Sequence, residues 1–426
     1  MVSLNLVINA SNLAGGEIET HPSKYLTLLS CAVAALCPNK STIDSPLIAK
    51  DTSAMMKACE IIGCTVKRSQ GKWSIWGVEK GFTPSQTALH LKNSETALSL
   101  MCALTSLSKV PTVLTGDPSI CKRAMPELTE ALRRIGIKIY STKQEESPPF
   151  LNFGGSLAGG TVNLKSIPMR HIPPVMLVAP YAQKDVRLLM PRTKFRFQVD
   201  SMIEIMKKAR CSVKGGDTLE IPSTPYGPLN YEVGRELSSV IPFIIASGML
   251  GSKLTIRSKH RFSKRDEAIA DVLRAFGLDI KLRGNHARVD GGNLRGTSVD
   301  ISWGPELFPF FAVLSCFSRG TTRVEGISEA RRMKSDRVAT VTMELKKMGA
   351  SILDRGDSVI IKGPCKLAGR EVDGHDDHAV AAALAVAGMG AEGRTVIRGG
   401  ADALGTTYSR FVSTFKSLGA DISYSG

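Results

Sequence analysis

The stretch LTEALRRIGIKI, residues 128–139, shows the pattern that decides the fold of this chain. Its apolar residues recur at helical spacing up to Ile135, Gly136 then stops the helix, and an apolar residue opens a strand. The same pattern of helix, stop and strand occurs six times. The six stretches are MMKACEIIGCTV (55–66), LTEALRRIGIKI (128–139), MIEIMKKARCSV (202–213), IADVLRAFGLDI (269–280), TMELKKMGASI (342–352) and FVSTFKSLGADI (411–422).

Five of the six stretches place a glycine at the helix stop, where a left-handed backbone suits glycine best. These glycines are Gly63, Gly136, Gly277, Gly349 and Gly419. The third stretch has Ala209 and Arg210 there, so we expect its helix to end differently. Neighbouring stops lie about 70 residues apart, which is longer than solenoid repeats. Each unit is therefore predicted to be a small α/β module with two helices and a few strands.

Six such modules divide into two domains of three. We expect the first domain at residues 16–233 and the second at residues 1–15 plus 234–426, with an active cleft between them. The Pro- and Gly-rich stretch 221–234 is the expected crossover. We expect the six quoted helices to pack inside each domain and the sheets to lie outside.

The charge of the chain favours anionic partners. Lys and Arg number 55 against 39 Asp and Glu, which gives a formal net charge of +16. Phosphorylated metabolites, nucleic acid and a lipid surface would all be attracted, and a generally basic protein is the alternative. Aromatic residues make up only 6% of the chain, and no basic run is interleaved with them, which argues against a stacking nucleic-acid groove.

Other features point to a soluble cytoplasmic protein without a metal or other cofactor. No apolar run reaches membrane-spanning length, and MVSLNLVINASNL at the start alternates like a strand rather than a secretory signal. The nine cysteines are scattered, without CxxC pairs, and are expected to be mostly buried thiols. The histidines show no metal-ligand spacing, and no phosphate-binding P-loop occurs.

Several segments resemble motifs of the enolpyruvyl transferase family. The segment 21–36 keeps Ser23 and Lys24 of a P-G-S-K-S helix start, and 41–52 ends in Lys50-Asp51-Thr52. The segment 92–101 keeps Asn93, Ser94 and Thr96, and 115–126 keeps Arg123 and Met125. The segment 320–337 ends in a Ser-Asp-Arg that includes Arg337, and 375–388 contains Asp377 and His378. The resemblance runs from about Gly15 to Ile422.

The resemblance implies a fold and a reaction. The fold is a two-domain inverse α/β barrel of six βαβαββ repeats, three per domain. The family transfers the enolpyruvyl group of phosphoenolpyruvate to a hydroxyl of a phosphorylated acceptor, without a metal. In its shikimate-pathway branch, which serves aromatic amino-acid biosynthesis, the acceptor is the 5-hydroxyl of shikimate 3-phosphate. A monomer is expected.

The resemblance also implies roles for individual residues. Lys24, Arg123 and Arg337 would gather around phosphoenolpyruvate, and the residue chemistry agrees, because cations and free backbone N–H groups at helix starts favour anions. Glu306 would act as the general base, and Lys24 or His378 could protonate the methylene carbon. The remaining substrate-binding candidates are Asn93, Ser94, Thr96, Ser166, Arg170 and Lys334.

Several positions depart from the family pattern. The acceptor-phosphate segment G-S-x-S-S-Q reads KSIPMR (165–170), the N-S-G-T glycine is Glu95, and a catalytic aspartate is replaced by Glu306. A family lysine falls on Met333, and the lysine of a late K-S-F segment falls on Thr406. Two interpretations stay open: a synthase whose charges have moved, with Arg170 and Lys334 as substitutes, or a homologue with a changed acceptor or no catalysis that only binds anions.

Two relatives of the same module type are further alternatives. A UDP-sugar enolpyruvyl transferase would use a loop cysteine several residues before the loop arginine, whereas Cys121 lies only two residues before Arg123. An RNA 3′-phosphate cyclase would need a histidine near its C-terminus, whereas the last histidine is His378.

Overall fold

The computed structural model describes residues 4–193, 195–405, 407–408 and 410–425. The chain forms two compact units, which we call the N-terminal unit (residues 22–233) and the C-terminal unit (residues 1–21 and 234–426). Among the described residues, no helix has the length and apolar character needed to cross a membrane.

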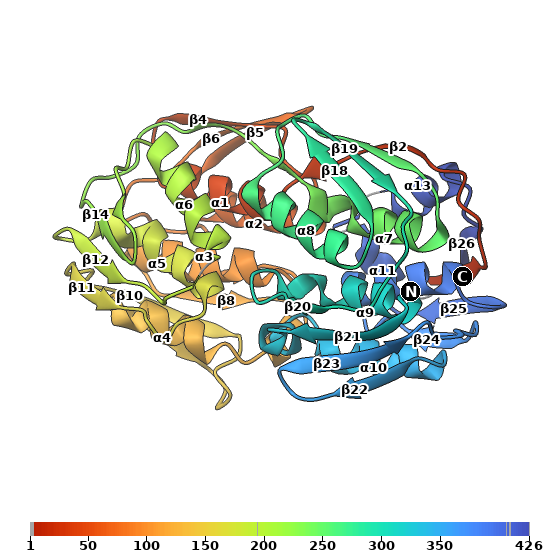
Figure 1. Cartoon of the computed structure of the whole chain (residues 1–426). Coiled ribbons are helices and arrows are strands. Elements are labelled where there is room, and N and C mark those ends of the chain that lie inside the picture. The colour runs from red at the N-terminus through yellow and green to blue at the C-terminus, as the bar shows by residue number, and fades with distance from the viewer. Residues whose placement is uncertain (1–3, 194, 406, 409, 426) are drawn as a thin grey trace. The chain divides into compact units, whose positions relative to one another are not determined.

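Each unit contains three four-stranded sheets with one shared topology (Figure 1). In each sheet an edge strand runs parallel to its neighbour, and the two remaining strands pair antiparallel. In four of the sheets one helix connects the two parallel strands and a second helix leads to the strands that follow, which is the βαβαββ order. In the other two sheets the parallel edge strand comes from a distant part of the chain. The fold class predicted from the sequence is therefore observed.

The sheets of the N-terminal unit are, in strand order, β15 (Asn230–Glu232), β4 (Lys40–Asp44), β6 (Lys72–Trp76) and β5 (Thr65–Ser69); β7 (Ala88–His90), β8 (Thr112–Thr115), β10 (Phe150–Gly155) and β9 (Ile137–Ser141); and β11 (Gly160–Asn163), β12 (Val186–Leu189), β14 (Thr218–Ile221) and β13 (Lys214–Gly215). Its helices are α1 (Lys24–Ala35), α2 (Lys50–Ile61), α3 (Glu95–Leu104), α4 (Pro126–Arg134), α5 (Ile172–Val178) and α6 (Phe197–Lys208).

The sheets of the C-terminal unit are β2 (Gly16–Glu19), β17 (Leu254–Arg257), β19 (His286–Asp290) and β18 (Asp279–Arg283); β20 (Ser298–Asp300), β21 (Gly320–Glu325), β23 (Ser358–Gly363) and β22 (Ser351–Asp354); and β24 (Glu371–Asp373), β25 (Arg394–Arg398), β1 (Asn5–Asn9) and β26 (Ile422–Ser425). Its helices are α7 (Ile241–Leu250), α8 (Lys264–Ala275), α9 (Phe308–Phe317), α10 (Arg337–Lys347), α11 (His378–Met389), α12 (Ala401–Leu404) and α13 (Phe411–Ser417).

Short elements connect these helices and strands. They are the strands β3 (His21–Pro22) and β16 (Arg235–Glu236), and the 3-10 helices η1 (Thr105–Leu107), η2 (Ile120–Lys122), η3 (Met169–His171), η4 (Ala179–Tyr181), η5 (Leu237–Val240), η6 (Pro305–Leu307) and η7 (Ser328–Arg332).

The domain boundary expected at residue 16 differs from the structure. Strand β2, Gly16–Glu19, pairs in parallel with β17, Leu254–Arg257, and residues 16–21 therefore belong to the C-terminal unit. The physical reason is that β17 needs a parallel edge neighbour, and the N-terminal segment supplies it from a distant part of the sequence. Strand β15 at the end of the N-terminal unit supplies the same edge to β4.

The five glycine stops follow the prediction, but the expectation that the third helix ends differently is wrong, because its backbone closes with the same hydrogen bonds. All five glycines adopt positive φ, between +93° at Gly277 and +111° at Gly63. At the third stop Arg210 takes a φ of +65°, so a non-glycine residue accepts the left-handed position there. Gly136 has a second constraint, because a Cβ on it would lie 2.5 Å from the backbone oxygen of Ser156.

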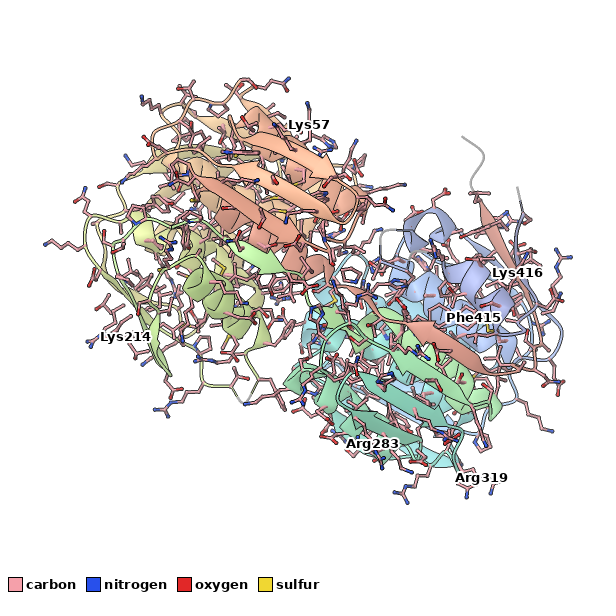
Figure 2. All side chains as sticks on the ribbon, turned by 90° about the horizontal axis from the view of Figure 1, so that it is seen from above. Lys57, Lys214, Arg283, Arg319, Phe415 and Lys416 are labelled. Carbon is pink, nitrogen blue, oxygen red and sulfur yellow. The ribbon has the colours of Figure 1, made fainter. Side chains whose placement is uncertain are left out.

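The expectation that the quoted helices form the interior is wrong. The buried helices are six others, α1, α3, α5, α7, α9 and α11, which are apolar on nearly every side. The quoted helices are half exposed, because a helix with one apolar stripe buries only that stripe. On α13, Phe415 is buried, and its ring centroid lies 4.5 Å from that of Phe243, while the neighbouring Lys416 is exposed (Figure 2). Lys57 on α2 is likewise exposed (Figure 2).

Candidate active site

The first polar cluster of the N-terminal unit surrounds the carboxylate of Glu95. Arg170 Nε lies 3.2 Å from Glu95 Oε1, and Arg123 Nη1 lies 3.7 Å from Glu95 Oε2. Arg123 Nη2 also donates to Asn93 Oδ1 at 2.6 Å. The three charged side chains are between 11% and 24% exposed. One carboxylate thus stands between two guanidinium groups, in the segment where the family motif has glycine.

Local structure explains how this cluster is held. Ser94 caps α3 by accepting the backbone N–H of Ala97, which makes Glu95 the first residue of that helix. Arg123 was expected at the start of α4, but Pro126 opens that helix and Arg123 follows η2 three residues earlier. Its guanidinium contacts the start of α3 through Asn93 and Glu95.

Lys24 lies at the start of another buried helix of the same unit. Ser23 caps α1 through the N–H of Leu26, and Lys24 Nζ pairs with Asp51 Oδ2 at 3.0 Å. The next residue, Tyr25, packs against Phe197 with the ring centroids 5.9 Å apart and the ring planes tilted by 59°, which places the starts of α1 and α6 together. Because η3, which carries Arg170, also lies beside α6, the Lys24 pair and the Glu95 cluster occur at the same end of the unit.

Three further candidates of the N-terminal unit have different surroundings. Ser94 uses its hydroxyl as a helix cap, and Thr96 is half-buried in the first turn of α3. Ser166 is exposed, and its hydroxyl accepts from Arg134 Nη1 at 3.2 Å. The structure thus joins Ser166 to Arg134 at the end of α4.

In the C-terminal unit, Glu306 belongs to a chain of charges. Arg265 Nη2 makes a very short contact with Glu306 Oε1, and Arg265 Nη1 lies 3.2 Å from Glu236 Oε2. Glu306 lies in η6, which leads directly into the buried helix α9, and its side chain is 30% exposed. Arg265 therefore holds the Glu306 side chain in place at the start of this buried helix.

Arg337 and Asp377 form a buried two-point ion pair. Arg337 Nε and Nη2 lie 2.8 Å and 3.0 Å from the two oxygens of Asp377, and the side chains are 7% and 0% exposed. Burial acts to raise the pKa of Asp377, but the guanidinium outweighs burial and holds the pKa well below its ordinary value. Asp377 also caps α11 through the N–H of Ala379. Arg337 Nη1 donates to the backbone oxygen of Glu306 at 3.2 Å, which links both charge systems.

His378 and Lys334 flank this pair. His378 is the first residue of α11, its side chain is 14% exposed, and its Nδ1 lies 3.6 Å from Asp377 Oδ1. Its ring lies 5.9 Å from that of Tyr408, which is buried. Lys334 is half-buried in the loop between η7 and α10. Thr406, at the expected K-S-F position, lies outside the described residues.

Sequence reasoning did not single out Arg265, Glu236 or Asp51 as site residues. Arg265 could have been found, since it follows the Ser263 cap at the start of α8, the same placement that drew attention to Lys24. Glu236 carries no comparable local signal. Within the described residues, no group of three or more His, Cys, Asp and Glu side chains is arranged to hold a metal ion.

The architecture is that of enolpyruvyl transferases of known structure. EPSP synthase from Acinetobacter baumannii aligns over 100% of both chains with a TM-score of 0.82 and 21% identity. The enolpyruvyl transferase NikO from Streptomyces tendae aligns over 99% of both chains with a TM-score of 0.80 and 18% identity.

The chain belongs to the EPSP synthase (3-phosphoshikimate 1-carboxyvinyltransferase) family, whose model matches residues 8–415. A 3-phosphoshikimate 1-carboxyvinyltransferase from Methanocaldococcus jannaschii is 30% identical over 98% of this chain and 99% of its own length. One from Methanococcus maripaludis shows the same identity and coverage. The protein is thus an enolpyruvyl transferase by family.

Proposed function

We propose that the protein transfers the enolpyruvyl group of phosphoenolpyruvate to the 5-hydroxyl of shikimate 3-phosphate and releases phosphate. Family membership across both units supports the reaction class. The observation that carries the assignment to this site is that Lys24, Arg123 and Arg337 are each partly or fully buried at a carboxylate partner. These positioned cations can bind a dianionic substrate beside their carboxylate partners or in place of them.

Each charged group then has a role in the proposed reaction. Lys24, Arg123 and Arg337 bind the carboxylate and phosphate of phosphoenolpyruvate. Glu306, oriented by Arg265, accepts the proton of the acceptor hydroxyl as its oxygen attacks the enolpyruvyl carbon. Lys24 or His378 delivers a proton to the methylene carbon. The groups with these proposed roles come from both units.

We expect the protein to bind shikimate 3-phosphate more weakly than phosphoenolpyruvate. Ser166 is exposed and bonded to Arg134, and Arg170 stands where the family has an amide and pairs with Glu95. We propose that Arg170 and Lys334 supply positive charge for the acceptor, together with Asn93, Ser94 and Thr96 at the start of α3. A changed phosphorylated acceptor is the second candidate function, favoured by these same substitutions.

The test is a phosphate-release assay with phosphoenolpyruvate and shikimate 3-phosphate, together with calorimetry of phosphoenolpyruvate binding. The wild type is expected to release phosphate only when both substrates are present. Arg123→Ala removes one charged contact and is expected to lower kcat/KM for phosphoenolpyruvate by about 30- to 1000-fold. Binding of phosphoenolpyruvate without turnover of shikimate 3-phosphate would favour the changed acceptor. Absence of both would refute the proposal.

Glu95 is predicted to compete with the substrate anion. Its carboxylate stands between Arg123 and Arg170, so a phosphate that uses these groups must displace it or accept its repulsion. Glu95→Gln should therefore tighten phosphoenolpyruvate binding by roughly threefold to tenfold, measured by calorimetry at low salt. Glu146→Gln is the matched control, because Glu146 pairs with Arg133 in the same unit and its removal changes net charge equally. Weaker binding in Glu95→Gln alone would mean that Glu95 instead positions the arginines.

Two remaining points are also proposals. We propose a monomer acting in the cytoplasm, which light scattering and cell fractionation would test.

A UDP-sugar reaction through Cys121 is disfavoured, because its thiol lies against the backbone oxygen of Gly116 at 3.4 Å. An RNA cyclase is disfavoured by the family match.

A further inference from the structure

Glu344 of α10 is a fully buried carboxylate at a position that the other repeats fill with uncharged residues. It lies five residues before the helix stop Gly349, and its side chain is 0% exposed. The residues five positions before the other five stops are Ala58, Ala131, Ile205, Val272 and Thr414. A buried charge costs free energy unless it is paired and hydrogen-bonded. Packing of the repeat alone would therefore favour an uncharged residue here.

The partners of Glu344 lie on its own helix and at the end of β24. The backbone N–H of Asp373 donates to Glu344 Oε2 at 3.1 Å, and His375 Nε2 lies 3.2 Å from Glu344 Oε1. Lys347, one turn further along α10, donates to the two carboxylate oxygens at 2.8 Å and 2.9 Å. Burial acts to raise the pKa of Glu344, but the bonds from these partners outweigh burial and lower that pKa. Glu344 thus joins α10 to the segment 373–375 as a carboxylate.

The loop that Glu344 contacts, residues 374–376, has an uncommon backbone conformation. His375 and Asp376 both have a φ of +50°, in the left-handed region that residues other than glycine rarely adopt. The N–H of His375 donates to Asp373 Oδ1 at 2.6 Å, and the N–H of Asp377 donates to the backbone oxygen of Gly374 at 2.9 Å. Such a conformation persists only where the surrounding structure holds it. The contacts of Glu344 with Asp373 and His375 are part of that surrounding structure.

Helix α10 holds this loop at two points. Arg337 and Glu344 are seven residues apart, so two helical turns place them on the same face, and both are buried. Arg337 pairs with Asp377 directly after the loop, and Glu344 contacts His375 within it. The residue after Asp377 is His378, which begins α11. The two contacts together therefore fix where this helix begins.

We propose that Glu344 is a positioning residue for the enolpyruvyl transfer: it holds the loop before α11 and thereby places His378. The catalytic part of this inference rests on the proposed function, in which His378 is a candidate proton donor. A donor displaced by about 1 Å can slow a reaction by roughly 100-fold. Lys24 and Arg123 have other partners, so their contribution to the binding of phosphoenolpyruvate should be retained.

The first test is Glu344→Leu in the full-length protein. Leucine gives this position the apolar character of its counterparts, and replacing a buried charge by an apolar residue is often neutral for stability. The unfolding temperature should therefore stay within about 5 °C of the wild-type value. By contrast, kcat should fall by about 10- to 100-fold, with less than about a threefold change in the Kd for phosphoenolpyruvate measured by calorimetry. A merely structural role would lower the unfolding temperature and leave kcat of the folded enzyme unchanged.

Amide hydrogen exchange measures the loop directly. The N–H groups of Asp373, His375 and Asp377 are all hydrogen-bonded in this segment. In Glu344→Leu their exchange should accelerate by about tenfold or more, because the loop opens without unfolding the unit. Glu344→Gln keeps an oxygen that can accept the N–H of Asp373, so it should recover part of both the protection and kcat.

Two further variants change the contacts of Glu344 one at a time. His375→Asn keeps a residue that tolerates the left-handed backbone but shortens the side chain, so kcat should fall by about threefold to 30-fold. Because the His375 side chain is 26% exposed, this variant tests the proposal even if Glu344→Leu does not fold. Lys347→Met is the matched control, since it removes the partner on α10 and leaves the loop contacts. It should change kcat and exchange by less than about twofold.

The exchange measurement separates this inference from the proposed function. If the wild type does not turn over shikimate 3-phosphate, faster exchange confined to residues 373–378 in Glu344→Leu still supports the role of Glu344 in holding the loop. Unchanged exchange in both Glu344→Leu and His375→Asn overturns it. With an active wild type, an unchanged kcat in these two variants, or an equal loss of kcat in Lys347→Met, also overturns it.

Discussion

Replacing Glu306 by glutamine is expected to lower kcat by about 100- to 10,000-fold with phosphoenolpyruvate and shikimate 3-phosphate. Glutamine keeps the shape and can still bond to Arg265, but an amide cannot accept the hydroxyl proton. The KM for phosphoenolpyruvate should change much less, because the Glu306 side chain is not among the groups proposed to bind it. Steady-state phosphate release and a single-turnover measurement would separate the chemical step from binding.

Glu236→Gln is the matched control for this experiment. Glu236 is the second carboxylate on Arg265, with its Oε2 3.2 Å from Nη1, so the variant changes the charge around the same arginine without removing the base. It should lose less than about tenfold in kcat. Equal losses in both variants would assign the effect to the orientation of Arg265 and not to proton transfer by Glu306.

Replacing Asp377 by alanine is expected to destabilise the C-terminal unit by about 3–5 kcal/mol, because a buried guanidinium loses its counterion. The loss includes the cap of α11, which is worth about 1 kcal/mol. For a unit of this size the transition should shift by roughly 6–20 °C. Differential scanning calorimetry would measure it, and an unchanged transition would show that Arg337 finds another partner.

The double variant Arg337→Met, Asp377→Ala is the control. It removes both charges, so it should recover part of the stability lost by Asp377→Ala alone. A double variant less stable by the sum of the two single losses would indicate that the residues act independently.

The contribution of this pair should depend on pH in one direction. The pKa of Asp377 is lower in the folded protein than in the unfolded chain, so the native state favours the carboxylate. The stabilisation is complete above the unfolded value near pH 4 and is lost as pH falls toward the depressed folded pKa. The difference between wild type and Asp377→Ala should therefore be constant between about pH 6 and pH 8 and shrink below about pH 4.

The sequence alone determined the repeating architecture. A helix stop depends on residues within one or two turns, and the positive φ of Gly136 and its four counterparts follows from that local requirement. The identity of the buried helices was also present in the sequence, since FPFFAVLSCF (308–317) is apolar all round and LTEALRR (128–134) is not. The prediction that the amphipathic helices form the interior was wrong, because a helix with a single apolar stripe lies at the surface and buries only that stripe.

The cations at helix starts, Lys24 and Arg337, could likewise be predicted, because helix capping is local. Their partners could not. Arg337 meets Asp377 across 40 residues, Arg265 meets Glu306 across 41, and Arg123 meets Asn93 across 30. Only the packed fold brings such residues within the few ångströms over which charges pair strongly. That Glu95 lies between two arginines, and that Glu306 is held by one, was therefore decided by the tertiary structure.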